Sequence, residues 1–338
     1  MPRPSTCRAP ALRRRTDERG LALILALLVI ALLTTLTLRL IGISRGERHD
    51  SGAFAAHTRL DAVLHSGLQL TLAVLQANRH MQSFDTPADP WAKISGRELQ
   101  ALLGHEGAAL EVRDLSGRLQ VNALIGQDAR GANRARRERL QREAWLRLLT
   151  SGRFGPLSED EALALIDALT DWIDADDSPR PAGAESSWYQ GRTGGYACRN
   201  GPVASLEELL LVRDMNRALL FGDREQPGLA DFITVSGSDG RVNINTAAPE
   251  VLLALGASSG QVADMIAFRA RAENRLQLAQ PDWPRRLGIS LPPELITTRS
   301  DAFLVRIEAT EGIFHRFGEA MVQRESSGQC SVLSWYLR

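Results

Sequence analysis

The sequence has few cysteines and almost no lysine, and neither sign of charge is in excess. Its 338 residues contain three cysteines, and 40 Lys plus Arg balance 40 Asp plus Glu, with almost all of the positive charge carried by arginine. The overall balance therefore does not favour nucleic acid or an acidic substrate. Cys7 precedes a long apolar run, and Cys198 and Cys330 could pair only with Cα atoms within about 7 Å. We expect two buried free thiols, with a disulfide as the alternative.

Motifs of common enzyme mechanisms are also scarce. The chain has no His-Glu-x-x-His zinc motif, no phosphate-binding loop and no Cys-His pairing, and its six histidines are scattered. His49, His57 and His65 recur at a spacing of eight, near one helix face, which is more typical of an exposed surface than of a metal site. The sequence predicts a noncatalytic protein.

Charge is missing from one long stretch near the N-terminus. Leu21–Leu38 has no charged residue and no proline, and the apolar run resumes after Arg39 to Ile43. As a helix this run would span about 35 Å, enough to cross a bilayer. A cleavable signal peptide would have a shorter apolar region followed promptly by a small-residue cleavage site. Six arginines from Arg3 to Arg19 predict a cytoplasmic N-terminus, so the bulk of the chain faces the periplasm or exterior.

Gly20 lies between the arginine-rich leader and the apolar run. This position resembles the class III leader of type IV pilins and type II secretion pseudopilins. The resemblance implies that prepilin peptidase cuts after Gly20, that the new N-terminus at Leu21 is methylated, and that the apolar helix is kept. The fifth residue after the cut is normally Glu, which pairs with a neighbouring subunit, but here it is Leu25. The K-type minor pseudopilin characteristically lacks this Glu. A subunit with no neighbour above it in the filament would not need the Glu for pairing.

Several local patterns predict secondary structure. Apolar residues continue at helical spacing over 44–80, so we expect one helix from about Leu21 to Asn78, or two helices with a kink near Gly46. Segments 111–124 and 233–248 share a Gly-Arg-apolar-polar-apolar-Asn core, and the first predicts a hairpin at Ser116-Gly117. Further helices are expected over 158–174, with Ser158 as N-cap, and over 204–215, with Ser205 as N-cap and Glu208 at the capping-box position. The last 40 residues alternate with period two, which predicts a three-stranded antiparallel meander.

These patterns and the leader together predict an α+β fold. We expect a pilin-like arrangement in which the long N-terminal helix packs on an antiparallel sheet, with a large helical insertion domain. The expected segments are the leader (1–20), the transmembrane part of the helix (21–43), the amphipathic helix and first strands (44–124), the helical insertion with an acidic loop (125–230), a strand plus a helix-hairpin-helix-like unit (231–298), and the C-terminal strands (299–338).

The acidic loop over 170–190 is the one group of residues with clear chemical content. Asp174, Asp176 and Asp177 follow a predicted helix C-terminus, where the helix dipole disfavours negative charge unless a cation offsets it. Carboxylates without His or Cys favour Ca²⁺ over a transition metal. Glu185 lies eleven residues after Asp174, as the last ligand of an EF-hand would, but Pro179 replaces the required glycine. A merely solvated acidic loop remains the alternative.

The same loop belongs to a longer resemblance, which runs from Gly20 to the C-terminus. Its motifs are Asp-Trp-Ile-Asp-x-Asp, Gly-Ala-Glu, the aromatic pair Trp188-Tyr189, and Asn200, Pro202, Ser205, Glu208 and Leu209 in that order. Together they resemble the K pseudopilins of type II secretion. The resemblance implies a head whose helical insertion binds Ca²⁺, with Asp174, Asp176 and Glu185 as ligands and Asp177 as a further candidate.

The resemblance also implies a cellular role. A K pseudopilin is a single-pass inner-membrane protein with a cytoplasmic N-terminus and a periplasmic head. It caps the tip of the periplasmic pseudopilus, and it promotes pseudopilus assembly and protein export. The implied partners are the I- and J-type minor pseudopilins, the pseudopilus, the inner-membrane secretion platform and prepilin peptidase.

Residues 242–270 carry a competing resemblance, to a helix-hairpin-helix module whose Gly-rich turn presents amide N–H groups to DNA phosphates. The alternative function is a membrane-anchored DNA-binding protein of a type IV pilus or competence-like system. However, the turn from Gly256 to Gly260 lacks the Gly-x-Gly core, and only Arg269 and Arg271 are basic nearby. A phosphate-binding surface needs clustered positive charge. We therefore expect a packing unit and no nucleic-acid partner.

Overall fold

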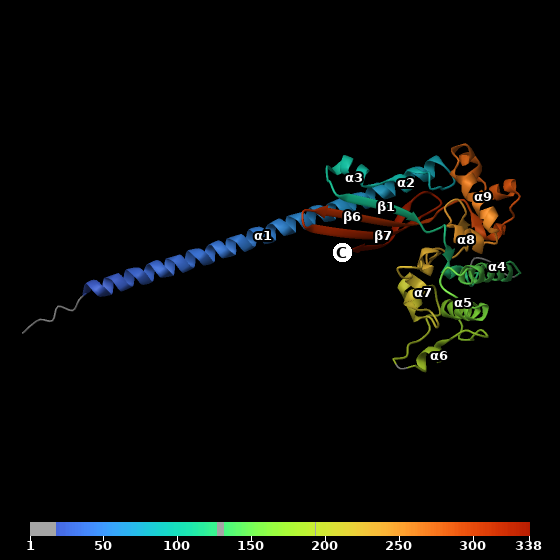
Figure 1. Cartoon of the computed structure of the whole chain (residues 1–338), viewed down its shortest axis with the longest axis horizontal. Helices are drawn as coiled ribbons and strands as arrows, with labels where there is room; N and C mark the ends of the chain where they lie inside the picture. Colours follow the sequence, from blue (N-terminus) through green and yellow to red (C-terminus); the bar gives the residue numbers. More distant parts are fainter. Residues whose placement is uncertain (1–17, 127–131, 193) are drawn as a thin grey trace, which may run out of the picture. The chain divides into compact units, whose positions relative to one another are not determined.

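The computed structural model describes residues 18–126, 132–192 and 194–338, with the side chains of 18–22, 40–52, 103 and 132 left out (Figure 1). It divides into two compact units, residues 1–59 and 60–338. Helix α1 (Glu18–Met81) is one continuous helix rather than the two helices of the alternative. No helix in the described part of the chain combines the length and the apolar character needed to span a membrane. Most of the expected leader, residues 1–17, lies outside the described residues.

The second unit, which we call the head (residues 60–338), contains a four-stranded antiparallel sheet in the order β1-β6-β7-β8. The last three strands form the expected meander. The strands are β1 (Ala108–Asp114), β6 (Ala302–Glu311), β7 (Phe314–Arg324) and β8 (Cys330–Leu337).

The C-terminal part of α1 packs on one face of this sheet. Leu60, Leu64 and Leu68 of the helix share one apolar core with Val305 and Ile307 of β6. Gly67 permits the close approach, because a Cβ there would lie 3.0 Å from Ile307 Cδ1. Two short helices, α2 (Pro90–Lys93) and α3 (Gly96–Leu103), follow α1 and contact β1 (Figure 1). The α+β fold class, with a long helix on an antiparallel sheet, is confirmed.

The predicted hairpin at Ser116-Gly117 is wrong. Strand β1 pairs along its whole length with β6, whereas β2 (Leu119–Gln120) pairs in parallel with β3 (Ile233–Thr234). Asp114 Oδ1 accepts a hydrogen bond from Ser116 N (2.7 Å), and this local turn redirects the chain. Gly117 then lies against the segment after β4 (Val242–Asn243), where a Cβ would come within 2.8 Å of Thr246 Oγ1. The glycine therefore serves a close approach between distant segments rather than a hairpin.

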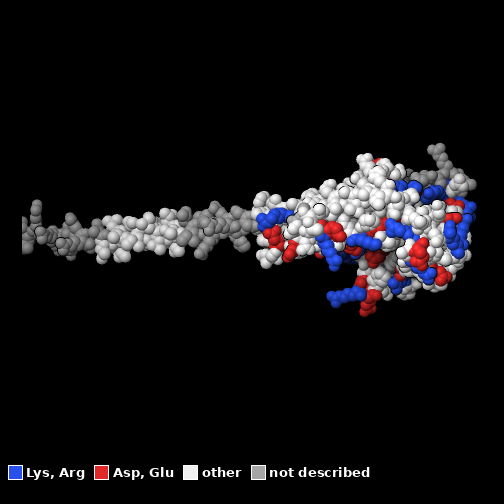
Figure 2. Space-filling view, turned by 90° about the horizontal axis from the view of Figure 1, so that it is seen from above, with Lys and Arg blue, Asp and Glu red and all other residues white. Residues whose placement is uncertain are grey.

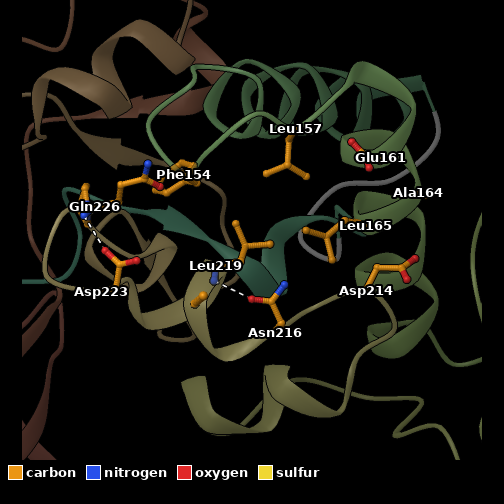
Figure 3. A pocket seen from close by; sticks show the side chains of 12 residues that line it. Phe154, Leu157, Glu161, Ala164, Leu165, Asp214, Asn216, Leu219, Asp223 and Gln226 are labelled. Carbon is orange, nitrogen blue, oxygen red and sulfur yellow. Dashed lines mark hydrogen bonds between the residues drawn. The ribbon is translucent and has the colours of Figure 1, made fainter.

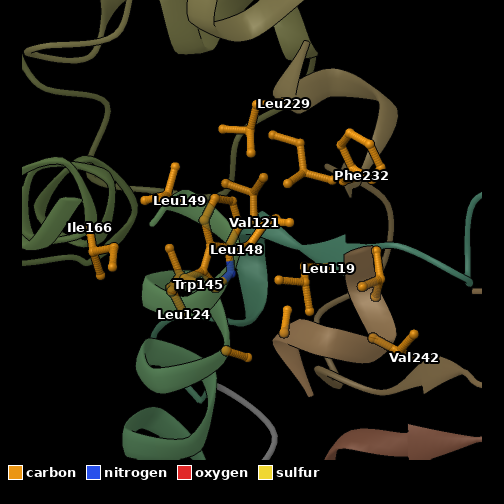
Figure 4. Close-up of a cluster of buried hydrophobic side chains, with 14 of the residues drawn as sticks. Leu119, Val121, Leu124, Trp145, Leu148, Leu149, Ile166, Leu229, Phe232 and Val242 are labelled. Carbon is orange, nitrogen blue, oxygen red and sulfur yellow. The ribbon is translucent and has the colours of Figure 1, made fainter. Parts of the chain in front are cut away.

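Helices fill the long connection between β1 and β6. The first part contains α4 (Ala132–Leu149), α5 (Glu159–Ile173), α6 (Ser186–Gln190), the 3₁₀ helix η2 (Leu206–Leu211), α7 (Arg217–Phe221) and η3 (Leu229–Asp231). Trp145 and Leu148 of α4 pack with Ile166 of α5, Val121 and Phe232 in one core (Figure 4). The expected helix over 158–174 is confirmed, including its Ser158 cap.

The helix expected over 204–215 is wrong in type and length. Only Leu206–Leu211 is helical, and it is a 3₁₀ helix that ends at the extended residue Val212. Ser205 caps it as predicted, but the Glu208 carboxylate accepts hydrogen bonds from Ala204 N (3.0 Å) and from Trp172 Nε1 (3.1 Å) on α5. These tertiary contacts override the local preference for an α-helix.

The two similar sequence segments do build similar structures. In the first segment β2 pairs in parallel with β3, and in the second β4 (Val242–Asn243) pairs in parallel with β5 (Ile296–Thr297). The matching asparagines each bridge two distant carbonyls: Asn122 donates to Val203 O and Val235 O, and Asn245 donates to Asp85 O and Leu278 O. The second segment continues into α8 (Pro249–Ala254), α9 (Ser259–Ala270), η4 (Ala272–Ala279), η5 (Trp283–Leu287) and η6 (Pro293–Leu295).

Candidate metal centre

The acidic loop is held between two helix ends. Asp174 is the C-cap of α5, and its N–H donates to Thr170 O (3.0 Å). The neighbouring Trp172 and Ile173 are buried and fix this end of the helix in the core. The loop then folds back, so that Glu185 becomes the N-cap residue of α6. The first and last of the predicted ligands are therefore positioned by regular structure.

The structure brings three of the four predicted ligands together. One carboxylate oxygen each from Asp174, Asp176 and Glu185 lie within 4.8 Å of one another. Two oxygens on opposite sides of a Ca²⁺ ion are about 4.8 Å apart, because each binds at about 2.4 Å. Asp174 and Glu185 are buried, and Asp176 is exposed, so the cluster faces solvent on one side.

Unsatisfied buried oxygens show that these residues fit a cation. Asp174 Oδ1 and both Glu185 carboxylate oxygens are inaccessible and have no hydrogen-bond partner. Burying a carboxylate without a partner is costly, and protein donors normally satisfy such groups. A hard divalent cation would accept these oxygens as ligands and offset their charge. Asp174, Asp176 and Glu185 are thus the residues that would hold Ca²⁺.

The electrostatics of the loop agree with this geometry. Burial, reinforced by the carboxylates of Asp171, Asp174, Asp177 and Asp176, raises the pKa of Glu185 to about 7. Burial also raises the pKa of Asp174, although its hydrogen bond with Arg180 opposes the change. A centre in which the ionised carboxylates repel one another in this way is stabilised by a cation, which would lower both pKa values.

Arg180 partly balances this negative charge from within the loop. Its Nη1 donates to Asp171 Oδ1 (2.8 Å) and to Asp174 Oδ2. Asp174 Oδ1 is left for another ligand. Gly183 is required beside this pair, because a Cβ there would lie 1.9 Å from Asp171 Oδ2. Arg180 therefore orders the loop and leaves Asp174 Oδ1 without a hydrogen-bond donor.

Asp177, the fourth predicted ligand, is engaged elsewhere. Its Oδ1 accepts hydrogen bonds from Ser186 Oγ (3.0 Å) and Asn200 Nδ2 (3.0 Å), which hold the pKa of Asp177 below its usual range. The Asn200 Oδ1 atom is buried and has no partner. Sequence reasoning did not consider Asn200 as a ligand, although it belongs to the Asn-x-Pro motif. Its amide oxygen is a further candidate ligand for Ca²⁺.

Both described cysteines are free, as expected. Cys198 is buried beside the acidic loop, with its Sγ 3.5 Å from Asp171 O, and Cys330 is half-buried at the start of β8. Burial raises the pKa of the Cys198 thiol to about 11, so the neutral thiol is favoured. Cys198 packs behind the carboxylates as a small apolar group.

The helix pair that resembles a DNA-binding module is packed against α4. Arg147 of α4 donates to Ala254 O (3.2 Å), the last residue of α8, and lies 3.6 Å from where a Gly256 Cβ would be. Arg269 donates to Ile244 O and Ala247 O rather than pointing at a ligand. On the face shown in Figure 2, acidic and basic side chains are interspersed over the head. These contacts favour a packing unit.

The expectation that the chain lacks a Gly-x-Ser-x-Gly motif is wrong, because this turn matches the motif in its letters. Residues 256–260 read GASSG, the Gly-x-Ser-x-Gly pattern of hydrolase nucleophile elbows. Such an elbow follows a strand, whereas this turn connects α8 to α9. Ser258 is the N-cap of α9, and its Oγ accepts a hydrogen bond from Gln261 N. Ser258 therefore has a capping role.

Comparison with known proteins finds relatives of this chain and a similar solved structure. The long helix, the antiparallel sheet and the helical insertion define a pilin-like α+β fold. Residues 117–221 match the family model of type II secretion system protein K. The resemblance to protein K found in the sequence is confirmed.

Similar proteins support the same assignment. The chain is 29% identical over 266 residues to type II secretion system protein K of Pseudomonas aeruginosa PAO1, covering 76% of this chain and 74% of that protein. It is 28% identical over 238 residues to protein K of Klebsiella pneumoniae, covering 69% and 68%. Its fold resembles a chain of the GspK-GspI-GspJ complex from enterotoxigenic Escherichia coli, with a TM-score of 0.62, 18% identity, and coverage of 85% of this chain and 99% of that one.

Proposed function

We propose that this chain is a K-type minor pseudopilin that caps the tip of a periplasmic pseudopilus and promotes pseudopilus assembly and protein export. The observation that carries the proposal is the size of the insertion in the pilin-like head. Strands β1 and β6 pair as neighbours, yet all the helices from α4 to η6 lie between them in the chain. Such a bulky insertion would obstruct the stacking of a further head above it.

The proposed partners are the I- and J-type minor pseudopilins, within the pseudopilus and on the inner-membrane secretion platform. The structurally similar chain comes from a complex whose title names GspK, GspI and GspJ. The shared fold extends over 85% of this chain, which supports a similar assembly. Transfer of these partners to this chain is our inference.

We further propose that the N-terminal helix anchors the protein in the inner membrane after cleavage behind Gly20 and methylation of Leu21. Large apolar side chains are exposed along this part of α1; they include Leu23, Ile24, Leu27, Leu28, Ile30, Leu32, Leu33, Leu36 and Leu38. Exposed apolar surface of this extent calls for a lipid or protein environment. The arginine-rich leader then orients the head towards the periplasm.

Calcium would stiffen the loop between α5 and α6. Held by Asp174, Asp176 and Glu185, the ion would join the end of one helix to the start of the next. This is a structural role, because the chain presents carboxylates to the ion while α5 and α6 fix their positions.

The tip assignment can be tested by placing the chain within assembled fibres. A tagged full-length chain would be produced with the other pseudopilins of its system, and the pseudopili imaged after immunogold labelling. We expect label at fibre ends and shorter fibres as the dose of the chain rises. A Gly20→Ala variant serves as the unprocessed control and should give no labelled ends. Label spread along the fibre sides, or fibre length independent of dose, would exclude tip capping.

A further inference from the structure

A cavity of about 470 Å³ opens between α5 and the segment around α7 (Figure 3). None of the described residues that line it belongs to the acidic metal centre. Its floor is apolar: Phe154, Leu165 and Leu219 are all buried there. Leu157, at the entry to α5, lines the same space and is half-buried. A volume of this size falls within the range of ligand sites in proteins and would accept a few side chains.

Carboxylates surround this apolar floor. Glu161 and Asp214 lie on one side of the cavity and Asp223 on the other (Figure 3). The side-chain amides of Asn216 and Gln226 complete the polar lining. Among the described residues that line the cavity, none is Lys or Arg. The lining therefore joins apolar surface to negative charge, with no internal counter-ion.

Two of these carboxylates are held in the ionised form. Hydrogen bonds from the backbone N–H and the hydroxyl of Ser158 hold the pKa of Glu161 below its usual range. The backbone N–H groups of Glu225 and Gln226 do the same for Asp223. These bonds use Glu161 Oε2 and Asp223 Oδ1, so a second oxygen of each carboxylate is free to accept from a ligand.

Nearby positive charge is weak or directed elsewhere. The N-terminus of α5 carries about half a positive charge, but Glu159, Asp160 and Glu161 in its first turn outweigh it. Arg153 pairs with Glu250 (2.9 Å), away from the lining residues. Among the residues that line the cavity, negative charge is therefore not balanced by positive charge.

Arg213, next to Asp214, also has other partners. Its Nη1 donates to Gly183 O (3.1 Å), and its guanidinium lies 5.3 Å from the centre of the Trp188 ring. Its Nε is 3.2 Å from Asp214 Oδ2, an exposed contact that is worth little in water. Asp214 Oδ1 is therefore left for an incoming donor.

We propose that this cavity is a recognition site for an arginine side chain of a partner polypeptide. The aliphatic stem of arginine would cover Leu165 and Leu219, and its planar guanidinium would reach the carboxylates around them. Several N–H donors in one plane suit oxygens placed on two sides of the cavity better than the single point charge of lysine does. The site is separate from the metal centre and does not depend on where the chain sits in a pseudopilus.

The test uses a matched pair of capped tripeptides, Leu-Arg-Leu and Leu-citrulline-Leu, which differ by one charge at nearly constant shape. They would be titrated into the full-length chain in nonionic detergent, with ¹³C-labelled leucine methyl groups observed by NMR. We expect saturable shifts at Leu165 and Leu219 with the arginine peptide, at least tenfold weaker binding of the citrulline peptide, and weaker binding at higher salt.

The variants isolate charge from local structure. Glu161→Gln, Asp214→Asn and Asp223→Asn together remove the negative charge but keep the groups that cap and turn the chain, and asparagine tolerates the left-handed backbone of residue 214 (φ 64°). Glu106→Gln, Asp264→Asn and Glu273→Gln remove three exposed charges elsewhere. We expect the first set to abolish arginine selectivity and the control set to preserve it. Equal binding of both peptides, shifts at other methyl groups, or equal loss in both variant sets would overturn the proposal.

Discussion

Arg324 and Asp85 form a fully buried ion pair, with Arg324 Nη2 2.6 Å from Asp85 Oδ2 and side-chain exposures of 0% and 1%. The guanidinium also donates to Leu75 O on α1 and to Ser300 O before β6. Asp85 in turn accepts from Ser300 N (2.9 Å) and Asn78 Nδ2 (3.0 Å). This pair joins the end of the long helix to the sheet, and its two members come from opposite ends of the head sequence.

Loss of the buried guanidinium should be strongly destabilising. Arg324→Met keeps much of the apolar stem but leaves Asp85 buried without its countercharge, at a cost of about 3–5 kcal/mol. Arg306→Met is the matched control in the same sheet, because its pair with Glu319 (2.7 Å) is half-exposed and worth at most about 1 kcal/mol. Urea denaturation of the full-length chain in detergent measures both. Equal effects of the two substitutions would contradict this reading of the ion pair.

Asp114 should make stability depend on pH. It is half-buried where β1 ends and accepts hydrogen bonds from Ser300 Oγ, Thr246 Oγ1 and Ser116 N. Burial raises the pKa of Asp114 from 3.8 to about 6, against the effect of these hydrogen bonds. Because its pKa is higher in the folded state than in the unfolded state, protonated Asp114 stabilises the fold. This contribution to the free energy of unfolding is complete below about pH 3.8 and is lost as the pH rises to about 6. The loss amounts to roughly 3 kcal/mol.

The Asp114→Asn variant separates this titration from other changes. Its lost hydrogen bonds shift the free energy of unfolding by an amount that does not depend on pH. The parent should therefore lose stability relative to the variant between pH 4 and pH 6. Denaturation curves measured across this range report the difference, and parallel curves would show that Asp114 does not titrate as described.

Local signals in the sequence were sufficient for the elements whose cause is local. The Ser158-to-Glu161 capping box fixes the start of α5, and the period-two alternation of the last 40 residues fixes β6 to β8. The pairing of β1 was not predictable in this way. Its partner β6 lies at the far end of the insertion, and the local turn at Ser116-Gly117 gives no information about it. Non-local pairing depends on tertiary contacts that periodicity does not encode.

The candidate metal centre shows the same limit at the level of single residues. Charge and helix-end position pointed to Asp174, Asp176 and Asp177, whereas the ligand set with Glu185 was implied by the resemblance to K pseudopilins. Charge and position alone could not separate Asp177 from the other two, because the distinction depends on Asn200, which reaches the loop from a later segment. The orphaned Asn200 Oδ1 is likewise visible only after folding.

Calcium should reverse the effect of neutralising the centre. With Ca²⁺ present, Asp174→Asn combined with Glu185→Gln should lower the melting temperature of the full-length chain, because two ligands are weakened. With a calcium chelator, the same variant should melt higher than the parent, since the repulsion that raises the pKa of Glu185 is relieved. The melting temperature of the parent should itself fall on chelation.

Asp177→Asn provides the matched control for the metal centre. It removes one charge from the same loop, but asparagine can still accept from Ser186 and Asn200 through its amide oxygen. We expect the chelator-induced shift of this variant to equal that of the parent. A parent that shows no shift at all would argue against a structural ion, and loss of the shift in Asp177→Asn would add this residue to the ligands.

Processing at Gly20 is tested by the smallest possible change to the leader. Gly20→Ala adds one methyl group directly before the proposed cut and should block cleavage by prepilin peptidase. The variant should then remain a precursor that runs more slowly on a denaturing gel than the processed parent. N-terminal sequencing of the membrane-extracted parent should begin at a methylated Leu21. Apolar residues follow immediately, so cleavage there would remove the charged leader and keep the helix. Identical mobility of variant and parent, or a mature chain that begins at Met1, would refute cleavage at this position.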